Sequence, residues 1–402
     1  MASLRPLIAQ GRKRLGFLIG AGAPAGISTN GSTEPLIPVV AGLTDKVIVA
    51  LEKQYGAVFQ ALRNEMDDAN IEALLSRIRS LGSTIGKASV YSLDGEGFKS
   101  LSEAICREIG KIVDKRLPSG SSPYTDLVSW ISGTSREHAV ELFTTNYDLL
   151  LEEALERAGI PFFDGFSGAR EPFFDPSSVA TDDLPSRWTR VWKLHGSLGW
   201  SANGLGQVIR TGGSESSQLV YPEHLKYDRT QSAPYSALFD RLKNFLRTPD
   251  TLLIVTGFSF ADAHISALLS ECLAANPSAN VFAFQFKPFD DEGYAAEIAR
   301  RRGNMSVYGP DKALINGIVA PWKPGDPPTR DWDSIRSAYW SNTGKGNPYF
   351  TLGKFSELAR FLASSRSTRE ILSDNIIPFA SDAPLDEAKP AKELILTAGT
   401  SE

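Results

Sequence analysis

Asn146, Asp148 and His195 are the residues of this chain whose types and positions suit chemistry on a small ligand. Asn146 and Asp148 are two residues apart, so an amide and a carboxylate could together orient a sugar hydroxyl or a water molecule. His195 lies directly before a glycine, and an imidazole there could accept a proton at neutral pH. Gly20 and Gly22 lack the Cβ atoms that would keep a backbone turn away from a phosphate group. These residue types point to proton transfer beside a phosphate-bearing ligand.

Each of these residues follows a short apolar run, which predicts a buried strand. The junctions read LGFLI-GAG at 15–22, ELFT-TNYD at 141–148, VWK-LHGS at 191–197 and LLIVT-GFS at 252–259. Buried strands that stop at Gly, Asn, His or Ser are typical of a parallel sheet whose carboxyl edge opens into a ligand crevice. We therefore expect four strands to bring their polar ends to one shared site.

The apolar periodicity predicts an α/β fold, a Rossmann-like parallel sheet with helices on both faces. Helical spacing over residues 43–135 indicates an inserted helical module, and strands alternate with helices after residue 141. We expect this domain to span residues 1–302 and a C-terminal extension to span 303–402, with a flexible acidic tail from about 381. Residues 162–223 are rich in Pro, Gly, Ser and aromatic residues, which predicts an irregular cover broken by the VWKLH strand.

Composition and cysteine content limit the classes of binding partner that we expect for this chain. The net charge of −5 leaves no overall basic field, so we expect no direct nucleic-acid binding. No apolar run is long enough to span a bilayer, and we expect a cytoplasmic protein without a membrane partner. Cys106 and Cys272 lie far apart and cannot supply a four-cysteine zinc site, so no metal is expected. Residues 341–348 read SNTGKGNP, which lacks the first glycine and the Ser/Thr of a P-loop.

Structural roles compete with chemical ones at each of these positions. Asn146 and Asp148 are of the types that cap helix N-termini, and their spacing alone favours that role at the start of the helix LLLEEALE. A single histidine more often bonds a backbone carbonyl, and a lone glycine loop is as often a tight turn. Asp262 is predicted to cap the helix AHISALLSECLA and is assigned to structure rather than to catalysis. The LHG string at 194–196 shifts the preference for Asn146 and Asp148 towards chemistry.

The four strings together resemble the sirtuin superfamily, in which GAG, TNxD, LHG and GxS occur in this order along a Rossmann-like domain that binds NAD. The resemblance runs from about Leu15 to about Ala263. It implies NAD+ as substrate, with Asn146 and His195 catalytic and Asp148 supporting the site. It also implies cofactor-binding roles for Gly20, Ala21, Gly22, Thr145, Gly257 and Ser259.

Two departures separate the chain from protein-deacylating sirtuins. The region after the LHG string contains no cysteine, whereas deacylases carry two CxxC pairs there. The glycine loop continues into STN at 28–30, where deacylases use an aspartate and an arginine. These departures point to the sirtuin-like NAD+ hydrolases of bacterial antiphage defence, which the chain resembles in lacking zinc and in carrying a large helical insertion. Its length, with little beyond the catalytic domain, resembles the kind associated with a hexameric HerA-type ATPase.

That resemblance implies cleavage of the nicotinamide–ribose bond to ADP-ribose and nicotinamide, and defence by NAD depletion. It also implies a homo-oligomer and a HerA-type partner. Two alternatives stay open at this stage. A non-catalytic NAD or ADP-ribose sensor would bind the nucleotide without turnover, and a protein-lysine deacylase would require a peptide groove for which the sequence offers no support.

Overall fold

The structure is a computed structural model of the 402-residue chain. It describes residues 8, 11–28, 33–67, 69–211, 233–323, 338–342 and 348–364. The chain divides into two compact units, Met1–Arg366 and Ser367–Glu402, and every described residue belongs to the first. The tail predicted to be flexible from about residue 381 lies outside the described residues, as does the Gly-Lys pair at 344–345.

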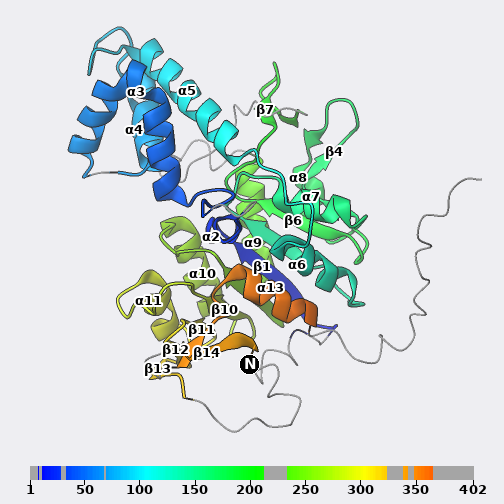
Figure 1. Ribbon diagram of the computed structural model, residues 1–402. Coiled ribbons are helices and arrows are strands. Elements are labelled where there is room, and N and C mark those ends of the chain that lie inside the picture. The colour runs from blue at the N-terminus through cyan, green and yellow to red at the C-terminus, as the bar shows by residue number, and fades with distance from the viewer. Residues whose placement is uncertain are drawn as a thin grey trace, which may run out of the picture. The chain divides into compact units, whose positions relative to one another are not determined.

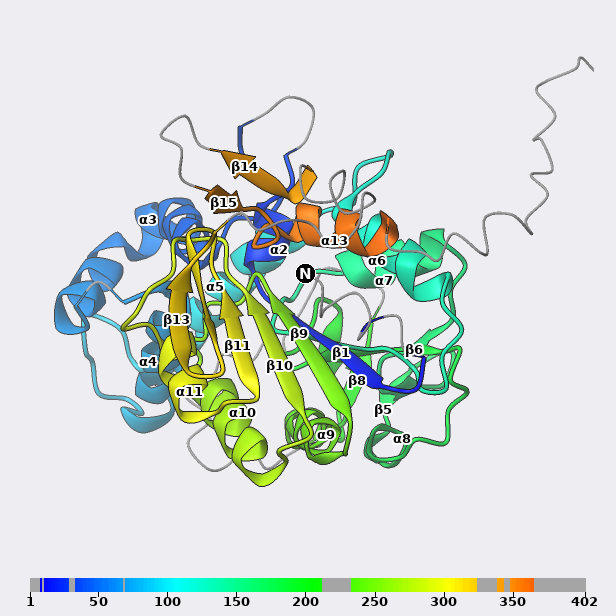
Figure 2. The ribbon, with the colours of Figure 1, turned by 90° about the horizontal axis from the view of Figure 1, so that it is seen from below.

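A nine-stranded sheet forms the centre of the described unit (Figure 2). Its order is β13 (Ile318–Pro321), β12 (Lys312–Ile315), β11 (Met305–Tyr308), β10 (Asn280–Phe284), β9 (Thr251–Thr256), β1 (Arg14–Ile19), β2 (Glu141–Thr144), β6 (Thr189–Lys193) and β3 (Phe162–Phe163). The strands from β11 to β3 run parallel, and within this sheet the pairings of β12 with β11 and with β13 are antiparallel. The predicted α/β fold with a mostly parallel sheet is confirmed.

Helices cover both faces of this sheet, as Figure 2 shows for α9, α10 and α11 on one side and α6, α7 and α13 on the other. Their bounds are α6 (Pro123–Ser132), α7 (Leu150–Arg157), α9 (Tyr235–Arg247), α10 (Ala263–Ala275), α11 (Tyr294–Arg301) and α13 (Phe355–Ser364). Successive residues of β1 point to opposite faces, so Phe17 enters one hydrophobic core and Leu18 the other. Coverage on both sides explains why the parallel strands read as unbroken apolar runs.

The predicted helical insertion is helical in the structure. It contains α3 (Val40–Glu65), α4 (Ile71–Thr84) and α5 (Gly95–Val113), which pack against one another beside the sheet, and then α6 (Figure 1). Polar side chains define where these helices begin: Asn70 accepts hydrogen bonds from two amides of α4, and Ser122 forms a capping box before Pro123 of α6. Within the described residues, no helix has the length and apolar character to cross a membrane.

The cover predicted over residues 162–223 is more regular than expected. A four-stranded antiparallel sheet forms there from β4 (Phe166–Ser167), β5 (Phe173–Phe174), β8 (Val208–Arg210) and β7 (Trp200–Ala202), with the short helix α8 (Pro176–Ala180) beside it. Strands of two or three residues are too short to show a periodicity, so the sequence pattern missed them. The boundary at residue 302 stays a prediction; β11 to β13, which follow it, continue the same large sheet.

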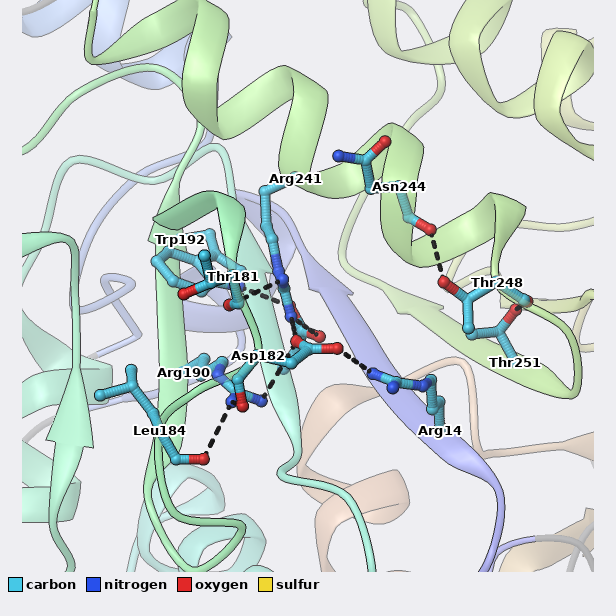
Figure 3. Close-up of polar contacts among 11 residues, drawn as sticks. Arg14, Thr181, Asp182, Leu184, Arg190, Trp192, Arg241, Asn244, Thr248 and Thr251 are labelled. Carbon is cyan, nitrogen blue, oxygen red and sulfur yellow. Dashed lines mark hydrogen bonds and ion pairs between the residues drawn. The ribbon is translucent and has the colours of Figure 1, made fainter. Parts of the chain in front are cut away.

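Charged side chains cluster at the amino end of the central strands (Figure 3). Arg241 of α9 forms a two-point ion pair with Glu141, the first residue of β2, with nitrogen–oxygen distances of 2.6 and 2.8 Å. Glu141 also accepts a hydrogen bond of 2.7 Å from Trp192 Nε1. Asp182 bridges Arg241 at 2.7 Å and Arg14 at 2.8 Å. This cluster lies at the end of the sheet opposite to the strand ends predicted to form the site.

Candidate functional site

The register of the sheet brings the four predicted strand ends to one level. Ile19, the last residue of β1, is the register partner of Thr144 on β2 and of Thr256 on β9, and Thr144 is in turn the partner of Lys193 on β6. The residues that follow are therefore neighbours along one carboxyl edge. In the sheet, β2 pairs with one side of β1 and β9 pairs with the other. The chain passes from β1 to β2 first and reaches β9 later, so the connections leave β1 in opposite directions. This edge is therefore a topological switch point, where open α/β sheets bind ligands.

The two glycine turns of this edge lie against each other. The Gly20 amide donates to the Thr256 carbonyl at 3.0 Å, and the Gly22 amide donates to the Gly257 carbonyl at 2.9 Å. A Cβ on Gly20 would lie 2.4 Å from the Gly257 carbonyl oxygen, and Gly257 itself has a φ of +64°. The glycines are thus required by the close approach of two backbone turns, a reason that the sequence argument about phosphate contact did not include.

Asn146 joins the end of β2 to the end of β1. Its side-chain Nδ2 donates to the Gly20 carbonyl at 3.2 Å, and its backbone amide donates to Thr144 Oγ1 at 3.0 Å. The residue is 8% exposed, and its side chain does not cap the following helix, since α7 begins after Leu149 without a side-chain cap. The helix-capping alternative therefore does not account for Asn146.

Asp148, in contrast, makes the local contact that the capping alternative expects. Its Oδ1 accepts a hydrogen bond of 3.1 Å from the Leu150 amide at the start of α7. Burial raises the pKa of Asp148 to about 6, although the charge of Lys193 and the hydrogen bond from Leu150 act in the opposite direction. Asp148 thus supports the turn that carries Asn146.

Lys193 is a buried cation beneath this turn that the sequence analysis missed. Its Nζ lies 3.3 Å from Glu152 Oε1 on α7 and donates to the Asp148 carbonyl oxygen. The side chain is 2% exposed, so this bond ties the end of β6 to the turn after β2 within the protein interior. The available signal was a lysine inside the apolar run VWKL, directly before the histidine.

His195 meets a carboxylate at the start of α10. Its Nε2 lies 3.0 Å from Oδ2 of Asp262, and both side chains are 8% exposed. Asp262 also caps α10, because its Oδ1 accepts from the amides of His264 at 2.9 Å and Ile265 at 3.0 Å. The helix cap predicted for Asp262 is confirmed. The sequence indicated only this structural role, and the contact of Asp262 with His195 was not predicted.

The remaining predicted residues lie along the same edge with different exposure. Thr145 and Ala21 are half-buried, and Ser259 is exposed, with its Oγ accepting from the Ala261 amide at 3.4 Å. Of the other histidines, His138 lines a cavity with Arg14, Asp182 and Arg190 at the opposite end of the sheet. His264 is an exposed residue in the first turn of α10, and His224 lies outside the described residues. The described part of the chain contains no group of three or more His, Cys, Asp or Glu that could hold a metal ion.

A family model described as a SIR2-like domain matches residues 140–304. This segment is similar to a SIR2-like domain. The SIR2-like segment contains Asn146, Asp148, His195, Gly257, Ser259 and Asp262, and sheet pairing joins it to the glycine turn at 20–22. The match supports the resemblance to sirtuins over these residues.

Two further comparisons frame this result. The chain is similar to a solved structure described as "Structural Basis for the Mechanism and Regulation of Sir2 Enzymes", at 14% identity and a TM-score of 0.36, covering 78% of this chain and 91% of the other. A match at this TM-score carries no argument about the fold, which is established by the sheet topology described above. No curated protein matches the chain.

A pH-dependent stability follows from the buried carboxyl of Asp148. Between its ordinary pKa of 3.8 and about 6, the folded chain keeps a proton that the unfolded chain releases, so this residue lowers stability as the pH rises through that window. Asp148→Asn keeps an acceptor for Leu150 and cannot ionise. Relative to the wild type, we expect its free energy of unfolding to increase by about 2–3 kcal/mol between about pH 4 and about pH 7. Urea unfolding across this range measures the difference, and parallel pH profiles of the two proteins would contradict it.

Proposed function

We propose that this chain is an NAD+ hydrolase that cleaves the bond between nicotinamide and ribose. The observation that carries the proposal is the placement of Asn146 and His195. Each lies two residues beyond a register partner, Thr144 or Lys193, so an amide and an imidazole follow the ends of neighbouring strands at the switch point. The similarity of residues 140–304 to a SIR2-like domain supports NAD+ as the ligand.

The proposed reaction breaks the bond between the ribose C1′ and the nicotinamide nitrogen, and the electron pair leaves with nicotinamide. The positive charge that develops on the ribose favours a site of oriented polar groups without a nearby free cation. Asn146 would hold the ribose and the incoming water, and His195 would accept a proton as water adds to C1′. The products are ADP-ribose and nicotinamide.

The turns around Gly20, Ala21, Gly22, Thr145, Gly257 and Ser259 would hold the dinucleotide backbone. Because the Gly20 and Gly22 amides already donate to the Thr256 and Gly257 carbonyls, other groups of these turns would contact the pyrophosphate. A zinc module of the deacylase kind has no support from the cysteines, because Cys106 on α5 and Cys272 on α10 are each buried in a different helix. The proposal therefore favours hydrolysis over deacylation.

By resemblance, we further propose that the chain acts in the cytoplasm as an effector that depletes NAD+ during antiphage defence. The same resemblance suggests a homo-oligomer and association with a hexameric HerA-type ATPase. The proposal of these partners is based on the four sequence strings and on the absence of zinc-binding cysteine pairs. Co-purification of the chain with such an ATPase tests it.

Nicotinamide release from NAD+ by the purified chain tests the reaction, with an NAD+-binding titration on the same samples. We expect release by the wild type and its loss in His195→Ala with binding retained, since the imidazole accepts a proton rather than anchoring the dinucleotide. Binding without release, both alone and with the ATPase added, would instead identify a sensor. Neither binding nor release would contradict the proposal.

A further inference from the structure

We propose that Asp262 positions His195 as the proton acceptor of the site, so that the end of β6 and the start of α10 form a carboxylate–imidazole pair. This inference rests on the proposed NAD+ cleavage. It assigns a second task to a residue whose position in the sequence indicates only a helix cap.

The backbone of α10 fixes the carboxylate of Asp262. Oδ1 accepts from two consecutive amides, those of His264 and Ile265, at 2.9 and 3.0 Å. A carboxylate held at one oxygen by two amides has little rotational freedom, and Oδ2 is then left to face another group. That group is Nε2 of His195, at 3.0 Å.

No other group of the described part of the chain competes for the two facing atoms of this pair. Within the described residues neither Nε2 nor Oδ2 has another hydrogen-bond partner, and both side chains are 8% exposed. The two atoms are within ion-pair distance, but the ring N–H does not point straight at the oxygen, so the contact falls short of a well-aligned hydrogen bond. Catalytic contacts are often loosely aligned before the ligand binds.

The charge of this pair favours an ionised carboxylate. Burial raises the pKa of Asp262, but the contact with His195 and the two amides of α10 outweigh it and lower the pKa below its ordinary value. When the contact is aligned, the ionised carboxylate of Asp262 accepts a hydrogen bond from the Nε2–H of His195, which fixes the imidazole in the tautomer protonated at Nε2. Nδ1 then carries the lone pair that can take a proton from water or a ribose hydroxyl, and the carboxylate stabilises the imidazolium that forms.

Asp262→Asn separates the two tasks of this residue. Asn is as good a helix N-cap as Asp, so α10 should be retained. The Asn amide would instead donate to Nε2 and move the ring proton to Nδ1, which removes the acceptor. We expect kcat for nicotinamide release to fall about 100-fold, with KM changed less than about threefold and the melting temperature unchanged.

Asp94→Asn is the matched control, because Asp94 caps α5 through the Gly97 amide at 2.8 Å and lies outside the sheet edge. We expect it to leave kcat unchanged. Asp262→Ala, which loses cap and charge together, should lower both kcat and the melting temperature. Wild-type kcat in Asp262→Asn would overturn the inference while leaving the proposed function intact.

Nitrogen-15 NMR of the histidine side chains tests, without measuring turnover, whether Asp262 sets the tautomer of His195. The His195 signals are assigned by their disappearance in His195→Gln. We expect the wild type to carry its ring proton on Nε2 and Asp262→Asn to carry it on Nδ1. The same tautomer in both proteins would overturn the inference, and absence of NAD+ cleavage by the wild type would overturn the proposed function without affecting this measurement.

Discussion

Asn146→Ala is expected to lower kcat for nicotinamide release from NAD+ by about 10²- to 10³-fold, the usual cost of removing one oriented polar group from a reaction centre. Asn146 is 8% exposed, and its side-chain amide is held by its bond to the Gly20 carbonyl. It is therefore preorganised before the charge on the ribose develops. Steady-state kinetics of nicotinamide release measure the loss, and thermal unfolding on the same samples reports whether the fold survives.

Asn276→Ala is the matched control for loss of a buried amide. Asn276 ends α10, and its Nδ2 donates to the Leu246 and Thr248 carbonyls, each at 2.9 Å, at the opposite end of that helix from Asp262. We expect this variant to lose stability and keep its kcat. Equal losses of kcat in Asn146→Ala and Asn276→Ala would show that the first effect is structural, and NAD+ hydrolysis would then need another centre.

The strands that carry the site were predictable because they are buried on both faces. LGFLI and LLIV are unbroken apolar runs, ELFT has the apolar centre LF, and burial between two helical layers favours such strands. Parallel pairing then places their carboxyl ends on one edge without further information. The shared position of Gly20, Asn146, His195 and Gly257 therefore follows from local sequence plus one topological rule.

The contacts within the site were not predictable in the same way. Asp262 has a complete local explanation as the cap of α10, and nothing in its neighbourhood along the chain indicates His195. Lys193 likewise contacts Glu152, a residue of a helix on another segment. Such pairs depend on how α7 and α10 pack on the sheet, and the side-chain distances of that packing are not encoded in periodicity or spacing.

The short strands of residues 162–211 were not predicted from the sequence, for a different reason. β4 and β5 contain two residues each, so they offer no alternation to recognise. Aromatic packing organises them instead, since Phe166 contacts Phe174 and Trp200, with ring centroids 5.5 and 5.1 Å apart. The aromatic content was visible in the sequence, but the pairing of the strands was not.

Glu141→Ala is expected to lower the free energy of unfolding by about 3–5 kcal/mol, the cost of breaking a buried ion pair by removing one partner. Glu141 is 2% exposed, and both of its oxygens are bonded to Arg241, which is 5% exposed. The variant also removes the acceptor of Trp192 Nε1. Asp182 cannot replace Glu141, because its side chain is 45% exposed and is already shared with Arg14. Urea unfolding at neutral pH measures the loss.

A double variant separates two contributions to this loss of stability, the unpaired buried charge and the lost side-chain contacts. Glu141→Leu with Arg241→Met removes both charges and keeps much of the apolar volume, so it should be more stable than Glu141→Ala. Figure 3 shows Arg241 in contact with Thr181 and Asp182 as well, so the double variant should not regain full wild-type stability. Since the cluster lies at the amino end of β2, and Asn146 follows its carboxyl end, the folded fraction of each variant should keep its affinity for NAD+. A loss below about 1 kcal/mol in Glu141→Ala would mean that Arg241 reaches water when its partner is removed.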